Sequence, residues 1–280
     1  MWVFHTPDFD KRGYEGFPWV KWQELPVIDI TNRYLPKKDV QGMVMRIQAF
    51  DWFHTQGIQR VFYVDADTII KKDFRDIYKT GLTPTTPLAA CEDYVYIDDP
   101  LLGKLYGKVS YEFARRMVIN RRYFNSGVLY VDLPFMYNKL ALTGEVSLID
   151  YFVQNSHRYL FPDQDLLNEL YPDYIKLPRM FNAYADMAVG RYMSASEAMS
   201  ARYRISNSII IHFLAKSKPW KIGPELEMVK AQVPIEYYWE AMQPVITLLD
   251  KNFVATIIEN MRRYKHIIDH YRLTEDFLDE

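Results

Sequence analysis

The strongest constraint on the fold is a short apolar run, Val-Phe-Tyr-Val at residues 61–64, that ends in the acidic pair Asp65 and Asp67. A run this short and apolar on both faces is typical of a central strand in a parallel sheet. The preceding segment carries the pattern of a crossover helix, because apolar and aromatic side chains recur there at helical spacing: Met43, Ile47, Phe50 and His54. Gly57 follows, and glycine tolerates the left-handed conformation that is common just past a helix end.

Further apolar runs of strand length extend this pattern. Residues 26–30 predict a short strand ahead of the helix, and strand, helix and strand in this order imply a right-handed crossover in a doubly wound sheet. Residues 88–91, 127–131 and 209–212 are apolar enough to form buried strands. The chain is therefore predicted to be an α/β protein, with a mostly parallel, Rossmann-like sheet flanked by helices.

The C-terminal part predicts a helical appendage. Pro244 can open a long helix whose apolar residues recur on one side and whose end is rich in basic residues. Such a helix either packs on its own domain or on a partner subunit, with the basic residues complementing its dipole, or lies on an anionic membrane. The first alternative is favoured. The predicted division is a catalytic domain at residues 1–222 and a helical extension at residues 223–280.

Composition excludes several classes of protein. The chain has 280 residues, enough for one α/β domain with an appendage. Its 34 basic and 36 acidic side chains leave a net charge of -2, which argues against a chain-wide grip on nucleic acid. The single cysteine, Cys91, allows no internal disulfide and favours a reducing compartment. Because the sequence has neither an apolar run of membrane-spanning length nor a signal-peptide pattern, we expect a cytoplasmic protein, with peripheral membrane contact as an addition.

The acidic pair is the first candidate site. Ligands of open α/β sheets bind at the carboxyl ends of strands, and two carboxylates there form a hard oxygen site for a divalent cation. Such a cation can bridge the two phosphates of a nucleoside diphosphate. An isolated Asp-x-Asp is weak evidence, because most such pairs are solvated or cap helices. A haloacid-dehalogenase type of phosphotransferase is the competing interpretation, but the threonine it expects is replaced by Ile69, with Thr68 one position early.

Three later segments complete a pattern with the acidic pair. Residues 123–129 place Asn125 and a serine immediately before a buried strand. Residues 161–168 place carboxylate, amide and carboxylate side chains at a predicted helix start. Residues 209–213 end an apolar strand in His212, and Lys-Pro-Trp follows at 218–220. In this order, the four segments resemble glycosyltransferase family 8, the retaining enzymes that include glycogenin and bacterial lipopolysaccharide galactosyl- and glucosyltransferases. The resemblance covers about residues 25–220.

The resemblance implies a fold of the GT-A type and a bound metal, usually manganese. By motif match, Asp65, Asp67 and His212 are its protein ligands, and diphosphate oxygens complete the shell. Two carboxylates and one imidazole suit manganese better than magnesium, which prefers oxygen ligands and remains the alternative. Taken alone, His212 reads as a buried core histidine. Its place after a strand and before Lys218 reverses that interpretation.

The resemblance also implies residues that bind the donor. Lys218 matches a lysine that contacts the donor phosphates, and Asp163 matches a residue that holds the sugar hydroxyls. Gln164 stands beside the anomeric carbon, where an amide is a poor nucleophile. The match therefore favours a same-face mechanism through an oxocarbenium-like state over the double displacement that a carboxylate nucleophile would support. Three further positions match residues near the donor or lining its sugar: Arg46, Asp93 and Asn125.

The predicted function is transfer of a hexose from UDP-glucose or UDP-galactose to a glycan, a glycolipid or another hydroxyl acceptor. Two departures from the family pattern leave a catalytically weak or silent member as one alternative, and the Asp-x-Asp after a strand leaves a metal-dependent phosphotransferase as another. Only 64 residues precede Asp65, too few for the usual first strand–helix unit that holds uracil and ribose, so the chain is expected to be a fragment or to hold the base differently. A missing first strand would leave a sheet edge open to another copy of the chain. Ala215 stands where the family has glycine.

Overall fold

A computed structural model describes residues 1–11, 17–30, 37–93, 122–185, 205–214 and 235–244, and the single positions 251, 255, 259 and 262. The chain forms two compact units. Unit 1 comprises residues 1–9, 20–64 and 75–179, and unit 2 comprises residues 10–19, 65–74 and 180–280. Among the described residues, no helix is both long enough and apolar enough to cross a membrane.

Unit 1 is built on a four-stranded mixed sheet with the order β3-β6-β5-β7. β6 lies antiparallel to both β3 and β5, and β5 lies parallel to β7. All nine residues of β6 are buried, as expected for the strand with a neighbour on each side. A separate two-stranded sheet pairs β1 with β2 in parallel. The strands of unit 1 are β1 (Trp2–His5), β2 (Lys21–Glu24), β3 (Arg60–Val64), β5 (Leu88–Glu92), β6 (Phe124–Asp132) and β7 (Ile175–Lys176).

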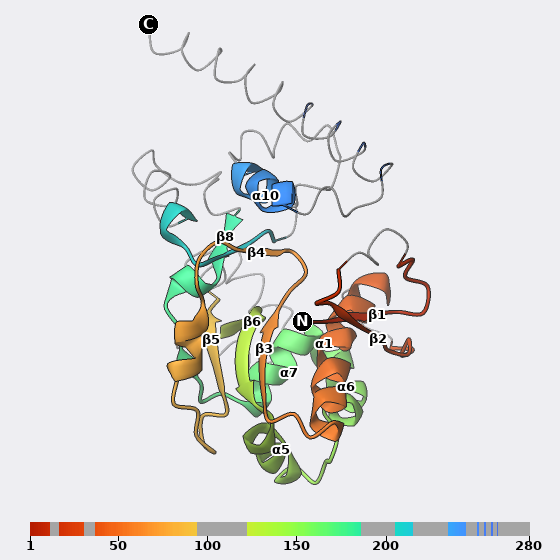
Figure 1. Cartoon of the computed structure of the whole chain (residues 1–280). Helices are drawn as coiled ribbons and strands as arrows, with labels where there is room; N and C mark the ends of the chain where they lie inside the picture. Colours follow the sequence, from red (N-terminus) through yellow and green to blue (C-terminus); the bar gives the residue numbers. More distant parts are fainter. Residues whose placement is uncertain are drawn as a thin grey trace, which may run out of the picture. The chain divides into compact units, whose positions relative to one another are not determined.

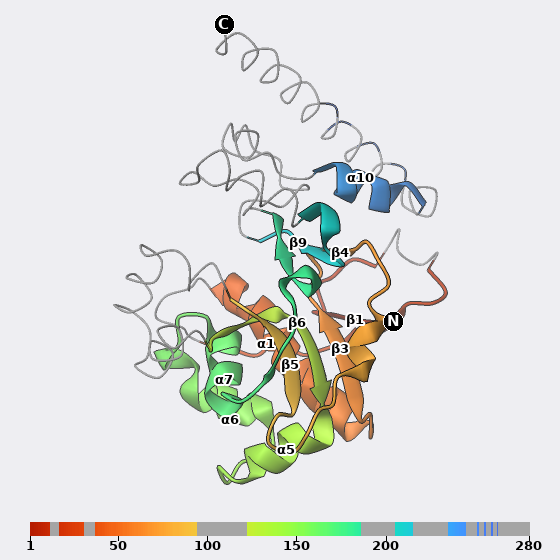
Figure 2. The same cartoon turned by 90° about the vertical axis from the view of Figure 1, so that its left-hand side faces the viewer.

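Helices cover one face of this sheet. α1, α6 and α7 pack against one another, and α7 also contacts β6 (Figure 1; Figure 2). Ile47 and Phe50 of α1 are fully buried and share one core cluster with Leu129 and Val131 of β6. The helices of unit 1 are α1 (Lys37–Thr55), α5 (Leu133–Ala141), α6 (Leu148–Asn155) and α7 (Pro162–Leu170), with 3-10 turns at Arg75–Lys79, Ser156–Arg158 and, at the junction with unit 2, Arg179–Phe181.

Glycine ends α1, as its sequence predicts. Gly57 has a φ of 70°, in the left-handed region that residues with a Cβ rarely adopt. Its N–H donates to the carbonyl of His54, and the next N–H, of Ile58, donates to the carbonyl of Phe53, both at 3.0 Å. These two bonds form a Schellman motif, which satisfies carbonyls of the last helical turn.

Unit 2 contains a three-stranded sheet with the order β4-β9-β8. β9 (Ile210–His212) lies antiparallel to β4 (Thr68–Ile70) and parallel to β8 (Ala183–Tyr184). The helix α10 (Ile235–Met242) contacts β4. There, the ammonium of Lys71 lies 3.5 Å from the ring centroid of Tyr237. This cation–π contact stabilises the packing of α10 against β4.

Several expectations from the sequence are confirmed. The predicted helix is α1, and the apolar runs at 88–91, 127–131 and 209–212 form β5, β6 and β9. The helix start expected at 161–168 is the start of α7. α10 lies within the region expected to be helical, and the single described positions 251, 255, 259 and 262 are helical as well. Most of the helix expected after Pro244 lies outside the described residues, and the division at residue 222 stays a prediction.

Two expectations about the strands are wrong. Residues 26–30 form no strand, although Ile30 is only 5% exposed. The run at 61–64 belongs to β3, which is an edge strand antiparallel to β6 and not a central parallel one. Phe62, Tyr63 and Val64 are accordingly only half-buried. The crossover between these two segments is therefore absent, and the four-stranded and three-stranded sheets are mixed where the sequence predicted mostly parallel pairing.

Candidate functional site

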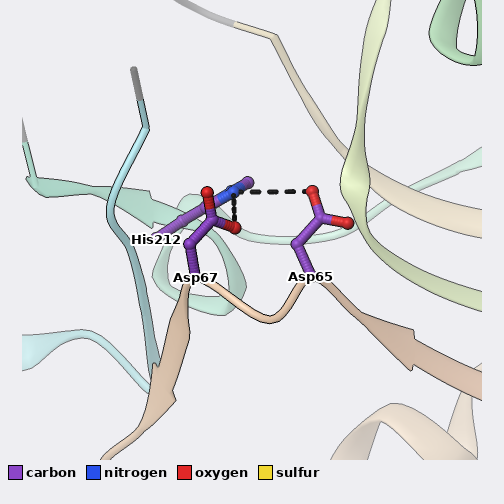
Figure 3. A group of neighbouring side chains, drawn as sticks. All are labelled: Asp65, Asp67 and His212. Atoms are coloured by element: carbon purple, nitrogen blue, oxygen red, sulfur yellow. Dashed lines mark hydrogen bonds and ion pairs between the residues drawn. The ribbon is translucent and has the colours of Figure 1, made fainter. Parts of the chain in front are cut away.

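Unit 2 brings Asp65, Asp67 and His212 together (Figure 3). One ligand atom from each lies within 4.8 Å of the other two. His212 Nε2 is 3.1 Å from Asp67 Oδ1 and 3.6 Å from Asp65 Oδ2. The three side chains predicted to be metal ligands thus meet in space, although 145 positions separate Asp67 from His212.

Strand pairing positions these three side chains. Thr68, the first residue of β4, stands opposite His212 in the antiparallel ladder with β9. The N–H of Phe213 donates to the carbonyl of Asp67 at 2.8 Å, and Thr68 Oγ1 donates to the carbonyl of Asp65 at 2.7 Å. The two carboxylates therefore lie on a closed turn that the ladder holds against the histidine.

The cluster has a buried side and an open side. His212 is 1% exposed, whereas the carboxylate side chains of Asp65 and Asp67 are 22% and 13% exposed. His212 Nδ1 lies 2.9 Å from Asn182 Oδ1, an acceptor, so the tautomer with its proton on Nδ1 matches this hydrogen bond. The Nε2 lone pair then faces the two carboxylates.

Three converging lone-pair atoms fit a cation better than any uncharged occupant. Two carboxylate oxygens and one imidazole nitrogen match the ligands of a borderline divalent ion such as manganese. Among the described residues, Asp65, Asp67 and His212 are the group that could hold such an ion. The donor set therefore fits a divalent metal ion.

Unit 1 holds a second group of polar residues, the buried cluster. Every member is less than a tenth exposed, although all are polar and three are charged. They come from α1, from the residue after β5, from the start of β6 and from the first turn of α7. The members are Arg46, Asp93, Asn125, Ser126, Asp163 and Gln164. All but Ser126 were predicted to bind the donor or to act in catalysis.

Gln164 is at the centre of the buried cluster. Its Oε1 accepts from Asn125 Nδ2 and from the backbone N–H of Ser126, each at 3.0 Å. Its Nε2 donates to Asp93 Oδ2 at 2.9 Å. Because both ends of the amide are bonded, its orientation is fixed, and it fixes its neighbours in turn.

Ser126 joins the remaining members. Its hydroxyl accepts from Arg46 Nη1 at 2.6 Å and donates to Asp163 Oδ2 at 3.1 Å. Arg46 also forms a buried ion pair with Asp163, and its guanidinium lies 4.9 Å from the ring centroid of Tyr63. Sequence reasoning assigned no role to Ser126. The signal available was its place in the small polar pair before β6.

Two further side chains of α7 form hydrogen bonds that hold this helix beside β6. Asn168, fully buried, accepts from the N–H of Phe124 and donates to its carbonyl, both at 2.9 Å. Asp165 accepts from the hydroxyl of Tyr123 at 2.6 Å and from the N–H of Leu160 at 2.9 Å. These bonds place the first turn of α7 beside the start of β6, which is what brings Gln164 to Asn125.

Two positions singled out in the sequence lie outside the described residues: Lys218 and Ala215. Asn182 is the opposite case, since it bonds to a predicted ligand and sequence reasoning gave it no role. It stands one residue before a two-residue strand, too short a pattern to mark it in advance.

Comparison with known proteins agrees with this fold. The model of the family described as "Glycosyl transferase family 8" matches residues 30–222, more than half of the chain. The protein belongs to glycosyltransferase family 8.

Two curated relatives are lipopolysaccharide 1,2-glucosyltransferases of Escherichia coli. One, from strain K12, is 25% identical over 263 residues, which cover 90% of this chain and 67% of the relative. The other is 26% identical over 193 residues, 66% of this chain and 52% of the relative. Among solved structures, the galactosyltransferase LgtC in complex with donor and acceptor sugar analogues superposes with a TM-score of 0.50 at 15% identity, covering 85% of this chain and 79% of that one. This likeness shows the α/β fold of the GT-A type.

Proposed function

We propose that this member of glycosyltransferase family 8 transfers a hexose from UDP-glucose or UDP-galactose to a hydroxyl group of a glycan or glycolipid, with retention of the anomeric configuration. One observation carries the proposal. Asp65, Asp67 and His212, far apart in the chain, converge into a cluster of three lone-pair atoms that fits a divalent cation. The names of the relatives, a glucosyltransferase and a galactosyltransferase, support a hexose donor.

Manganese is the proposed ion, and magnesium is the alternative. Asp65, Asp67 and His212 would hold it, and when bound it would neutralise the charge that develops on the departing diphosphate. Lys218 is proposed to contact the same phosphates as a point charge. A cytoplasmic location, peripheral membrane contact and self-association stay predictions.

The buried cluster of unit 1 is proposed to bind the donor sugar. Asp163 and Arg46 present a carboxylate and a guanidinium, which suit recognition of sugar hydroxyls. The carboxylate of Asp163 is ion-paired with Arg46 and accepts from Ser126, and both contacts weaken it as a nucleophile. Gln164 is an amide held on both sides by hydrogen bonds. These features support a same-face reaction, in which the leaving phosphate accepts the proton of the acceptor hydroxyl and Gln164 gives electrostatic support.

Calorimetry with UDP-glucose and UDP-galactose, with and without manganese, tests the proposal. We expect donor binding that requires the metal, together with slow hydrolysis of the bound donor. Asp67→Asn removes a ligand charge and should abolish the metal requirement and most of the binding. Asp76→Asn is the matched control, because this carboxylate is 76% exposed and pairs only with a neighbouring lysine among the contacts observed.

The alternatives predict other results. No donor binding at saturating manganese would indicate a silent family member. Release of inorganic phosphate from phosphoesters would indicate a phosphotransferase. Donor binding that is equally tight without metal would overturn the role of the three ligands.

A further inference from the structure

We infer that Asn182 is the positioning residue of the metal centre: its side-chain oxygen holds the imidazole of His212 with Nε2 directed at Asp65 and Asp67. The inference rests on the proposed function, because it takes these three residues as metal ligands. It adds a fourth residue, which does not touch the metal and acts through the histidine.

The contact between Asn182 and His212 is buried on both sides. Asn182 is 0% exposed and His212 is 1% exposed, so the bond of 2.9 Å between Asn182 Oδ1 and His212 Nδ1 is shielded from water. Buried side-chain amides almost always find hydrogen-bond partners within the protein, because an unpaired one costs free energy. A bond that satisfies a buried amide and a buried imidazole together is therefore held firmly.

The pairing of β8 with β9 brings the residue before β8, Asn182, close to His212. Tyr184 of β8 stands opposite His212 of β9 in a parallel pair. Asn182 stands at a bend immediately before β8, and from there its side chain reaches the imidazole of His212. The ring of Tyr184 meets the imidazole edge-on, with centroids 6.0 Å apart. The N–H of Ile209 donates to the carbonyl of Met180 at 2.7 Å and fixes the backbone just before Asn182.

The contact with Asn182 matters because the position of the proton on the His212 ring decides whether Nε2 can bind a metal. A neutral imidazole carries one N–H, and the nitrogen that bears it cannot bind a metal. An acceptor oxygen at Nδ1 keeps the proton there and leaves the Nε2 lone pair for the cation. In the other tautomer, the Nε2 proton would point at Asp67 and occupy the place of the ion. Partners of this kind on a ligating histidine typically change metal affinity by about 10–100-fold.

Titration of the full chain with Mn²⁺ alone, without any nucleotide sugar, tests the inference. Asn182→Ala removes the acceptor and should weaken Mn²⁺ binding by about 10–100-fold. Asn182→Leu fills a similar volume with no acceptor and should weaken it to the same degree. Asn182→Asp keeps an acceptor at the same position and should bind Mn²⁺ at least as tightly as the wild type. His212→Ala removes the ligand itself and should weaken binding more than any Asn182 variant.

A spectroscopic readout separates positioning from general destabilisation. The coupling of Mn²⁺ to a directly bound imidazole nitrogen, measured by pulsed electron paramagnetic resonance, should be unchanged in Asn182→Asp and altered in Asn182→Leu. Asn155→Ala is the matched control, since this asparagine of unit 1 also makes a local bond, from Nδ2 to the carbonyl of Tyr151 at 2.8 Å. It should leave Mn²⁺ binding and the nitrogen coupling unchanged.

The possible outcomes are distinct. Wild-type Mn²⁺ affinity in Asn182→Leu would overturn the inference, and so would an Asn182→Asp variant as weak as Asn182→Leu, because cavity shape and not the acceptor would then matter. If Asn182→Ala does not fold, the leucine and aspartate variants carry the test. Wild-type affinity in His212→Ala would instead overturn the proposed metal site, and with it the proposed function.

Discussion

The buried cluster of unit 1 and the group of Asp65, Asp67 and His212 in unit 2 differ in how their polar atoms are satisfied. In the buried cluster of unit 1, many donors and acceptors bond to one another, and the guanidinium of Arg46 pairs with the carboxylate of Asp163. In unit 2, the three atoms that converge all carry lone pairs. The first group is held together by its own bonds, whereas the second could be completed by a cation. The side chains of the buried cluster are therefore positioned by their bonds to one another, whereas those of unit 2 are positioned by the pairing of their strands.

The largest expected effect tests whether the cluster of unit 1 is self-sufficient. Arg46→Met leaves the carboxylate of Asp163, which is 2% exposed, without its ion-pair partner. Breaking a buried pair in this way costs about 3–5 kcal/mol, which urea unfolding measures. Arg122→Met is the control: its pair with Asp173 is about half exposed on both sides, and exposed pairs contribute about 0–1 kcal/mol. A similar small loss for both variants would break the comparison.

The next effect concerns the cation of unit 2. Free Mn²⁺ at 100 times its dissociation constant should stabilise the wild type by about 2.7 kcal/mol, because it binds only the folded form. His212→Ala should abolish this gain, and His157→Ala, which changes an exposed histidine, should keep it. Arg46→Met should keep the gain as well, since its cluster lies in unit 1. Loss of the Mn²⁺ gain in Arg46→Met would show that the two groups are not independent.

A smaller effect is expected from the amide at the centre of the cluster. Gln164→Ala strands Asn125 and Asp93, which it now bonds, and should cost about 1–3 kcal/mol of unfolding free energy. It should slow hexose transfer, leave donor affinity largely intact and leave Mn²⁺ affinity unchanged. Gln154→Ala, which changes an exposed side chain, should move stability by at most about 0.5 kcal/mol. Loss of donor binding in Gln164→Ala would contradict the role proposed for it.

The smallest effect concerns the single thiol, Cys91, whose reactivity reports whether reagents in solution can reach the interior of unit 1. Cys91 lies two residues before Asp93 and is fully buried, and burial raises its pKa well above the ordinary value. At pH 8 it should resist iodoacetamide in the native protein, with or without Mn²⁺, and react fully after unfolding. Rapid alkylation of the native protein would show that unit 1 opens near its cluster.

The same thiol gives a pH dependence. A raised pKa means that the folded protein retains a proton that the unfolded chain releases, so the stabilisation is complete below the ordinary thiol pKa. It is lost as pH rises above about 8.5, by at most about 1.4 kcal/mol per pH unit. Cys91→Ala should reduce this slope between pH 8.5 and 10, as urea unfolding at each pH would show. An unchanged slope would contradict the shift.

Local patterns predicted the parts of the fold that depend on burial and chain direction changes. Ile47 and Phe50 mark α1, Gly57 marks its end, and the apolar run of β6 marks the centre of the sheet. The residues predicted for the metal meet, and so do those predicted for the donor that the structure describes. Motif order was sufficient for this, because each motif sits at the end of an element whose place in the fold is shared within a family.

Pairing partners could not be predicted in the same way. An apolar run records how much of a strand is covered, but not which strand lies beside it or in which direction, so β3 was expected to be central and parallel. Ser126 and Asn182 were missed for a related reason. Their roles arise from contacts with Asp163 and His212, which lie 37 and 30 positions away, and no local spacing records such contacts.

The pairing of β4 with β9 also means that the residues of the proposed metal site are synthesised at different times. The carboxylate of Asp67 precedes its histidine partner by 145 positions. At about 5–20 residues per second, a ribosome needs about 7–30 s to travel between them. During that interval the acidic turn offers an ion only weak, open ligation. At the proposed metal site, tight chelation would require β9 to be synthesised and docked, so loading with a cation would be a late event that reports assembly of both distant segments.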